Sequence, residues 1–255
     1  MSESPHSMGY ALTTDGLSKS FGGLKAVRDV SLNLARSELH AVIGPNGAGK
    51  STFVNLLSGE LRPTAGRIFL EGRDITGVPA HRRAHFGIAR SFQRTNILKT
   101  LSVLENVRLA AQAVALPLAR LLRAPGREAS LQERAHEALA RAGLNFGHQR
   151  IAGTLAHGQQ RQLEIAMTLA SRPKVLLLDE PLAGMGQEEG ARMTSLLQSL
   201  AKEHALLLIE HDMDFVFRVA DRMTVLVEGA VLASGTPAEV RANAAVQSAY
   251  LGGHA

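Results

Sequence analysis

The feature that most limits how this chain can fold is the glycine-rich octapeptide 44–51, which reads Gly-Pro-Asn-Gly-Ala-Gly-Lys-Ser. It fits the pattern G-x-x-x-x-G-K-[ST] in full. An apolar run at 39–43 stands before it, and a helix is expected to begin at about Lys50. Glycines let backbone N–H groups approach phosphate oxygens closely, and the positive end of the following helix favours an anion. The octapeptide therefore predicts a phosphate-binding loop between a strand and a helix.

Two side chains of this loop suit a nucleoside triphosphate. The ammonium of Lys50 can reach the β- and γ-phosphates, and the hydroxyl of Ser51 can hold Mg²⁺. The alternative is a glycine turn that binds nothing, but the strand before it and the helix expected after it favour the binding site. The residues expected to hold ATP here are Gly44, Pro45, Asn46, Gly47, Ala48, Gly49, Lys50, Ser51 and Thr52.

A second polar feature is a pair of carboxylates that follows an apolar run. Residues 175–178 read Val-Leu-Leu-Leu, which is typical of a buried parallel strand, and Asp179 and Glu180 come next. At the carboxyl end of such a strand, Asp179 can hold Mg²⁺ opposite Ser51. Glu180 is the natural general base for a water molecule that attacks the γ-phosphate. The alternative is that one of the two acids only caps a helix.

The order of strand and helix patterns predicts an α/β fold. Two short strands are expected within 11–33, and the region 101–170 changes to helical periodicity before strand patterns return. We expect a P-loop NTPase core with a mainly parallel sheet, an N-terminal antiparallel portion and an inserted helical subdomain. The expected organisation is one domain over 10–253, with a core lobe at about 10–93 and 172–253 and a helical lobe at about 94–171.

The composition suits an ordinary globular protein. Of the 255 residues, 45% are apolar and 20% are charged, so a sizeable core can be buried. The absence of cysteine excludes a disulfide framework and a thiolate metal site. The net charge of +5 arises from dispersed Lys and Arg, so no nucleic-acid partner is expected. No stretch reaches ~18 apolar residues and the polar start lacks the order of an export signal, so other chains are expected to hold the protein at any membrane.

Together these motifs resemble the ATP-binding subunits of ABC transporters over roughly residues 12–251. Phe21 stands where that family stacks an aromatic ring on adenine, although a core position at a strand end is the alternative for this residue. Gln93 matches the glutamine that touches Mg²⁺ or the attacking water, and His211 matches the histidine that contacts the γ-phosphate. The segment 155–159, Leu-Ala-His-Gly-Gln, stands where the family has its signature loop.

The resemblance implies a head-to-tail pair of ATP-binding subunits, with ATP between the phosphate loop of one and the signature loop of the other. The signature-loop residues expected to contact ATP are Ala156, His157, Gly158 and Gln159. The implied catalytic groups are Glu180, His211, Gln93 and Lys50. The implied Mg²⁺ ligands are Ser51, Gln93 and Asp179.

The spelling of three segments narrows the resemblance to the branched-chain amino acid importer group. These segments are 87–93 (Gly-Ile-Ala-Arg-Ser-Phe-Gln), 157–164 (His-Gly-Gln-Gln-Arg-Gln-Leu-Glu) and 210–213 (Glu-His-Asp-Met). The group also serves urea and short amides. It implies transmembrane permease subunits, a second ATP-binding subunit that is more often a different chain, and an extracytoplasmic solute-binding protein as an indirect partner. The implied location is the cytoplasmic face of the inner membrane.

Two departures from the family pattern leave alternatives open. Ala156 stands where the signature loop usually has serine, and Gly186 stands where aspartate or asparagine is usual. A lost hydroxyl contact to a charged group costs ~1.5–3 kcal/mol if nothing replaces it. One alternative is therefore a regulatory subunit with weak hydrolysis. Another is an ABC ATPase that acts on nucleic acid or ribosomes, but such proteins usually carry two ATP domains or a long inserted coiled coil.

Overall fold

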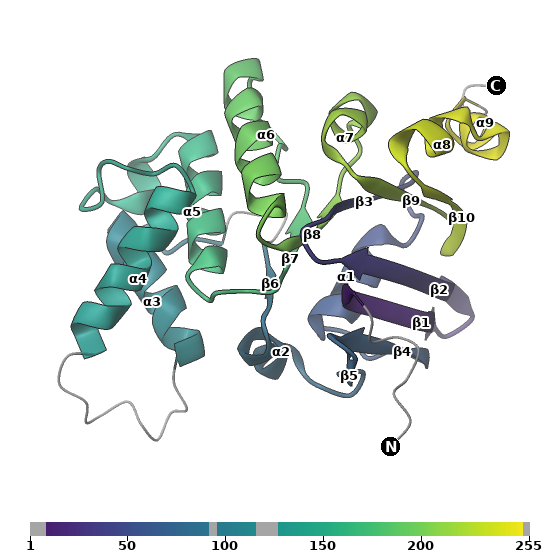
Figure 1. The fold of residues 1–255 in the computed structure, drawn as a ribbon, viewed down its shortest axis with the longest axis horizontal. Coiled ribbons are helices and arrows are strands. Elements are labelled where there is room, and N and C mark those ends of the chain that lie inside the picture. Colours follow the sequence, from purple (N-terminus) through teal and green to yellow (C-terminus); the bar gives the residue numbers. More distant parts are fainter. Residues whose placement is uncertain (1–8, 92–95, 116–126, 252–255) are drawn as a thin grey trace.

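The computed structural model describes residues 9–91, 96–115 and 127–251, which form two sheets with helices packed between and around them (Figure 1). The first sheet has four strands in the order β2-β1-β4-β5, and each neighbouring pair is antiparallel. The first two strands are joined by the expected turn at Gly22–Gly23. The bounds are β1 (Tyr10–Phe21), β2 (Leu24–Ala35), β4 (Ala65–Leu70) and β5 (Arg73–Asp74).

The second sheet has six strands in the order β10-β9-β3-β8-β7-β6. All neighbouring pairs are parallel except β9 and β10, which form an antiparallel hairpin. The bounds are β3 (Leu39–Ile43), β6 (Ile88–Arg90), β7 (Val175–Asp179), β8 (Ala205–Ile209), β9 (Arg222–Val227) and β10 (Ala230–Gly235).

The central strands are apolar throughout because both faces of the six-stranded sheet are covered. Along β7, Val175 and Leu177 pack into one hydrophobic cluster, while Leu176 and Leu178 pack into the other. Successive side chains of a strand point to opposite faces, so a strand buried on both sides has no polar face to show. This explains why the run 175–178 lacks the alternation of a half-exposed strand.

Helix α1 (Lys50–Ser58) lies between the two sheets and carries Phe53 and Leu57 into the cluster that they share. Its carboxyl end is fixed by Arg83, which is buried and comes from α2 (Ala80–Phe86). The Arg83 guanidinium donates hydrogen bonds of 2.7–3.0 Å to four backbone carbonyl groups. They belong to Leu56, Leu57, Val78 and Thr76.

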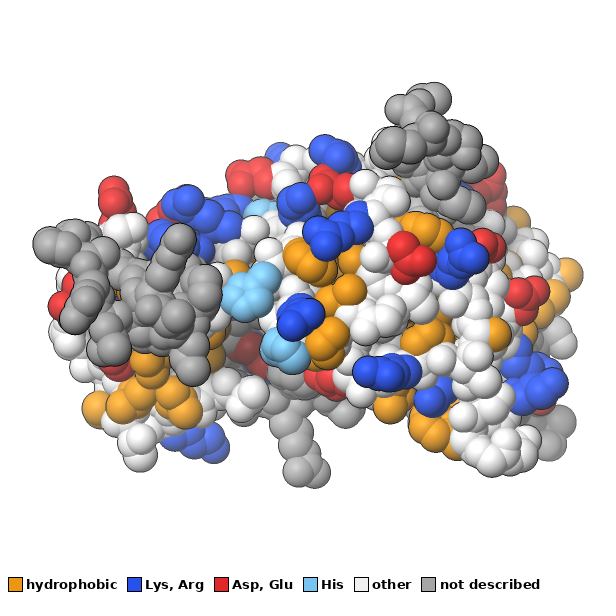
Figure 2. Space-filling model, turned by 90° about the horizontal axis from the view of Figure 1, so that it is seen from below, with side chains coloured by type: hydrophobic (Ala, Val, Ile, Leu, Met, Phe, Trp, Pro, Cys, Tyr) orange, Lys and Arg blue, Asp and Glu red, His pale blue; other side chains and the backbone are white. Residues whose placement is uncertain are grey.

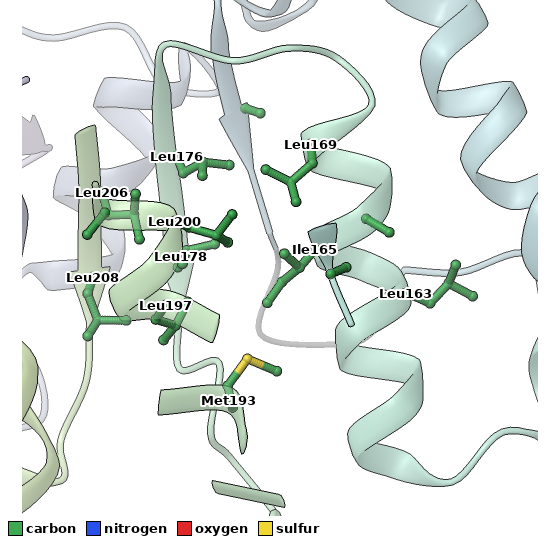
Figure 3. Packing of buried hydrophobic residues seen from close by; sticks show 14 of the residues in the cluster. Leu163, Ile165, Leu169, Leu176, Leu178, Met193, Leu197, Leu200, Leu206 and Leu208 are labelled. Atoms are coloured by element: carbon green, nitrogen blue, oxygen red, sulfur yellow. The ribbon is translucent and has the colours of Figure 1, made fainter. Parts of the chain in front are cut away.

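The opposite face of the six-stranded sheet is covered by a second set of helices (Figure 3). Met193, Leu197 and Leu200 from α6 point toward Leu176 and Leu206 of the sheet, and Leu169 from α5 approaches from the side. The helices that share this cluster have the bounds α5 (His157–Leu169), α6 (Gln187–Ala201), α7 (Met213–Val219), α8 (Pro237–Ala242) and α9 (Ala244–Leu251).

The inserted helical region lies at one end of the molecule, where α3 (Val103–Ala115) and α4 (Arg127–Arg141) pack on each other and on α5 (Figure 1). A short 3₁₀ turn at Ala152–Thr154 precedes α5. The expected fold class is therefore confirmed, with its mainly parallel sheet, its antiparallel portion and its helical insertion. Within the described residues, no helix combines the length and apolar character that crossing a bilayer needs.

Candidate functional site

The phosphate loop joins the end of β3 to the start of α1, as the octapeptide predicts. Gly44, Gly47 and Gly49 all have φ angles in the range that favours glycine, at 155°, 80° and 95°. A Cβ atom on Gly44 would lie 2.1 Å from the carbonyl oxygen of Leu226, and one on Gly49 would lie 2.2 Å from that of Ala26. The loop therefore requires glycine at these two positions for space as well as for backbone conformation.

The Lys50 side chain folds back over this loop. Its Nζ atom donates to the carbonyl oxygens of Gly44 at 2.6 Å and Pro45 at 3.0 Å. Burial lowers the pKa of Lys50 below its ordinary value, and the nearby carboxylates of Glu180 and Asp179 oppose that effect. The ammonium group is thus held at the mouth of the loop, where a phosphate group would meet it.

A cavity of about 870 Å³ opens over the loop. It is lined by residues 46–52, by Glu180 and by Phe21, which sits at the end of β1. The Phe21 ring is 46% exposed, so the alternative of a core position for this residue is wrong. Lys19 Nζ lies 5.1 Å from the ring centroid. An exposed aromatic ring at the rim of a phosphate cavity is suited to stack on a nucleobase.

The two acids that end β7 lie in different surroundings. The side chain of Asp179 is 9% exposed and its Oδ2 atom is 3.3 Å from Nη2 of Arg90. Burial raises the Asp179 pKa above its ordinary value, Arg90 opposes this, and Glu180 raises it further. Glu180 has a φ angle of 46°, unusual for a residue with a side chain, and its backbone N–H donates to Ile209. Its carboxylate lines the cavity over the phosphate loop.

Sequence reasoning missed Arg90, which ends β6 and connects Asp179 to α1. Its Nη1 atom contacts Asn55 Oδ1 at 2.5 Å, Ser58 Oγ at 3.3 Å and Glu60 Oε2 at 3.0 Å. An isolated arginine carries no sequence signal for this role, because the contacts depend on β6 and β7 being neighbours in the sheet.

His211 follows β8 and reaches the same place from the neighbouring strand end. Its Nδ1 atom is 3.5 Å from Glu180 Oε1 and 3.8 Å from Glu210 Oε2. The imidazole is 65% exposed, whereas the side chain of Glu210 is only 2% exposed. The structure therefore brings Lys50, Glu180 and His211 together. Gln93, the remaining catalytic candidate, lies outside the described residues.

The signature-loop residues lie elsewhere. Ala156 precedes α5, Gly158 is buried, and a Cβ atom on Gly158 would lie 2.7 Å from Glu189 Oε1. Together with Gln159 they line a separate cavity of about 340 Å³. The His157 ring packs 3.3 Å from where a Cβ atom on Gly184 would be. Within one chain, these residues do not share the cavity over the phosphate loop.

The polar groups at the loop fit Mg²⁺ held with a nucleotide rather than alone. Ser51 offers a hydroxyl at the start of α1, and Asp179 offers a carboxylate at the neighbouring strand end. Among residues 9–91, 96–115 and 127–251, no cluster of three or more His, Cys, Asp or Glu side chains forms a metal cage. Mg²⁺ usually binds through one or two protein oxygens together with substrate phosphates, so this donor set is suitable.

Comparison with protein families gives two matches. Residues 27–183 match the family described as ABC transporter. Residues 230–255 match the family described as branched-chain amino acid ATP-binding cassette transporter.

Similar proteins cover nearly the whole chain. The high-affinity branched-chain amino acid transport ATP-binding protein BraF of Pseudomonas aeruginosa is 43% identical over 249 residues, which is 94% of this chain and 97% of BraF. The corresponding protein LivG of Escherichia coli is 40% identical with the same coverage.

Solved structures agree with this assignment. The ADP conformation of MJ1267, an ATP-binding cassette of an ABC transporter, has a TM-score of 0.84 and 30% identity, covering 95% of this chain and 99% of MJ1267. A nucleotide-free ATP-binding cassette from an ABC transporter also has a TM-score of 0.84, with 29% identity and coverage of 94% and 98%. The chain therefore belongs to the ABC transporter family and is one of its ATP-binding, ATP-hydrolysing subunits.

Proposed function

We propose that this subunit powers the uptake of branched-chain amino acids or of related small polar solutes such as urea and amides. The observation that carries the proposal is the match of residues 230–255 to the branched-chain ATP-binding cassette family, outside the part that all ABC subunits share. The names of relatives at 40–43% identity over 94% of the chain support the same solute class.

In the proposed reaction, ATP lies over the phosphate loop with its base stacked on Phe21. Glu180 takes a proton from the attacking water, while Lys50 and His211 contact the γ-phosphate and orient it for in-line attack. Lys50 then exchanges its bonds to the Gly44 and Pro45 carbonyl groups for bonds to phosphate oxygens. Such positioning and charge neutralisation supply most of the rate enhancement in phosphate-loop enzymes.

Mg²⁺ would neutralise negative charge on the β- and γ-phosphates when bound. We assign Ser51 and Asp179 as its protein ligands, with Gln93 as a third candidate. Arg90 keeps the Asp179 carboxylate close to α1, which carries Ser51 at its start.

A second ATP-binding subunit completes the proposed site. Ala156, His157, Gly158 and Gln159 lie too far from the phosphate loop to serve it within one chain, because they line a different cavity. We propose that they close over the ATP of a partner subunit and that the partner is more often a different chain than a second copy. Ala156 and Gly186 favour a weaker contribution from this chain, since neither offers a polar side chain.

The permease subunits are proposed to dock in a groove of about 320 Å³ between the two proposed lobes. Its walls come from α2, β6, α3 and α5 and are mainly apolar, including Ala84, Ile88, Val114 and Met167. These lobes are the core at 10–93 and 172–253 and the helical region at 94–171 of one domain. The protein would then lie on the cytoplasmic face of the inner membrane and meet the solute-binding protein only indirectly.

A role on nucleic acid has less support. On the face drawn in Figure 2, Lys and Arg side chains are separated by apolar, uncharged and acidic surface and form no continuous basic field. Nucleic-acid binding proteins usually gather such charges on one face.

Solute uptake tests the proposed function directly. Cells that lack this gene, complemented with the parent chain or with Glu180→Gln, are assayed for uptake of labelled leucine, urea and acetamide. The proposal expects uptake of at least one of these solutes with the parent chain and its loss with the variant. Equal uptake of all three with both chains contradicts it.

A further inference from the structure

The buried carboxyl group of Glu210 is an unusual feature beside the proposed ATP site. Glu210 follows β8, its side chain is 2% exposed, and the mechanism above gives it no chemical step. Burial raises the Glu210 pKa above its ordinary value, backbone N–H groups of Leu182 and His211 oppose this, and Glu180 raises it further. Burying a carboxyl group is costly, and a neutral side chain would fill this place more cheaply. The cost calls for a role that a neutral residue does not fill.

The contacts of Glu210 join two loops at the carboxyl edge of the sheet. Its Oε1 atom accepts a hydrogen bond from the backbone N–H of Leu182 at 3.3 Å, and its Oε2 atom accepts one from the backbone N–H of His211 at 3.2 Å. Leu182 is two residues beyond Glu180. One carboxylate thus connects the segment that follows Glu180 with the segment that carries His211.

The backbone of His211 is fixed on both sides while its ring faces the site. On one side stands Glu210, and on the other Asp212 caps α7 by accepting from the Phe215 N–H at 3.0 Å. The ring itself is 65% exposed, and its Nδ1 atom lies 3.5 Å from Glu180 Oε1 and 3.8 Å from Glu210 Oε2. Two carboxylates on one side of an imidazole favour a proton on the nitrogen that faces them. That leaves Nε2 as the nitrogen available to a bound nucleotide.

We propose that Glu210 is a positioning residue for ATP hydrolysis, which fixes the backbone of His211 against the loop after Glu180 and keeps the proton of the neutral imidazole on Nδ1. This inference rests on the roles proposed above for Glu180 and His211. Glu210 touches neither substrate nor water in the proposed reaction, and it acts through His211.

The test replaces Glu210 with glutamine, which keeps the size but offers only one acceptor for the two backbone N–H groups. ATP turnover and nucleotide affinity are measured on the purified chain. The histidine ¹³Cδ2 chemical shift, which differs between the two neutral tautomers, is read at about pH 8, where an ordinary imidazole is neutral. His211 is assigned by the signal that disappears in His211→Asn.

The expected result is a fall in kcat of at least tenfold with nucleotide affinity within twofold of the parent. The neutral His211 ring should carry its proton on Nδ1 in the parent, and the Nε2–H share should at least double in Glu210→Gln. Glu210→Asp keeps the charge but has a shorter reach, so an intermediate kcat is expected. This variant also serves if the glutamine variant does not fold.

Glu38→Gln is the matched control, since Glu38 is also buried and lies 3.0 Å from Nδ1 of another histidine, His40, at the opposite edge of the sheet. It should leave both kcat and the His211 tautomer unchanged. An Nε2–H tautomer in the parent, a kcat within twofold of the parent in both Glu210 variants, or an equal loss in Glu38→Gln would overturn the proposal. A parent chain without ATP turnover would count against the proposed function instead, because the tautomer measurement still tests Glu210.

Discussion

Lys50 Nζ donates to the carbonyl oxygen of Gly44 at 2.6 Å, so the phosphate-loop lysine is bonded to the first residue of its own loop. The carbonyl group holds the ammonium above the loop until a phosphate oxygen replaces it. This contact orients the lysine in advance, and little rearrangement is needed when a nucleotide binds.

Lys50→Ala should therefore weaken ATP binding without unfolding the chain. Loss of a charged hydrogen bond to phosphate costs about 3 kcal/mol, which corresponds to roughly a hundredfold rise in Kd. Binding of a fluorescent ATP analogue measures the change. Lys202→Ala, at the end of α6 and remote from the cavity, is the control and should leave Kd unchanged. An unaltered Kd in Lys50→Ala would remove this lysine from the site.

Ala156→Ser should raise both stability and activity. Ala156 is the N-cap of α5, where a serine hydroxyl accepts a helix N–H that alanine leaves to solvent. Such a cap stabilises a protein by about 1 kcal/mol. The same hydroxyl supplies the phosphate contact that the family pattern has at this position, so ATP turnover of the assembled pair should rise. Thermal unfolding and turnover check the two effects separately, and unchanged turnover would contradict the role given to Ala156.

Arg83→Met should destabilise the core lobe strongly. The guanidinium satisfies four backbone carbonyl groups at the end of α1 and around α2, and its burial lowers the pKa of Arg83 to about 10. Leaving these carbonyl groups without partners should cost about 3 kcal/mol or more. Urea unfolding measures this loss. The neighbouring Arg82 is exposed, so Arg82→Met should change the free energy of unfolding by less than about 0.5 kcal/mol.

The stabilising effect of Glu38 should disappear in acid. Burial raises the Glu38 pKa, but the hydrogen bond with His40, the Ala35 N–H and the charge of Arg222 outweigh it, so the pKa lies below its ordinary 4.5. A carboxyl group with a lowered pKa in the folded state stabilises the protein above its unfolded pKa. That stabilisation is lost as the pH falls through the folded pKa. The gap in unfolding free energy between the parent and Glu38→Gln should therefore narrow below about pH 4.5.

Glu210 should behave in the opposite sense, because its pKa is raised. The folded state then binds the proton more tightly than the unfolded state, and ionisation costs stability as the pH rises above the ordinary value. Urea unfolding of Glu210→Gln should show its largest advantage over the parent, or its smallest deficit, at neutral pH. A deficit that grows with pH would contradict this sign.

The local features of the site could be predicted from the sequence because their chemistry lies in contiguous residues. The octapeptide 44–51, the acids Asp179 and Glu180, and the expected strands at 175–178 and 206–209 all stand where they were expected. A glycine pattern or an apolar run needs no knowledge of distant residues to be recognised.

Features that depend on neighbouring strands escaped prediction. Arg90 meets Asp179 only because β6 lies beside β7, and Glu210 reaches Leu182 only because β7 lies beside β8. Helix α6 was also not predicted, since its N-cap is Gly186, which offers no side-chain acceptor to mark the start.

The most direct test of the account is ATP turnover by Glu180→Gln measured beside its ATP affinity. The account predicts that the parent hydrolyses ATP and that the variant binds ATP with a Kd within twofold of the parent. Its turnover should fall at least a hundredfold, because removal of a general base costs about 10²–10⁴ in rate. A variant that hydrolyses ATP at the parent rate would contradict the assignment of Glu180 and, with it, the proposed mechanism.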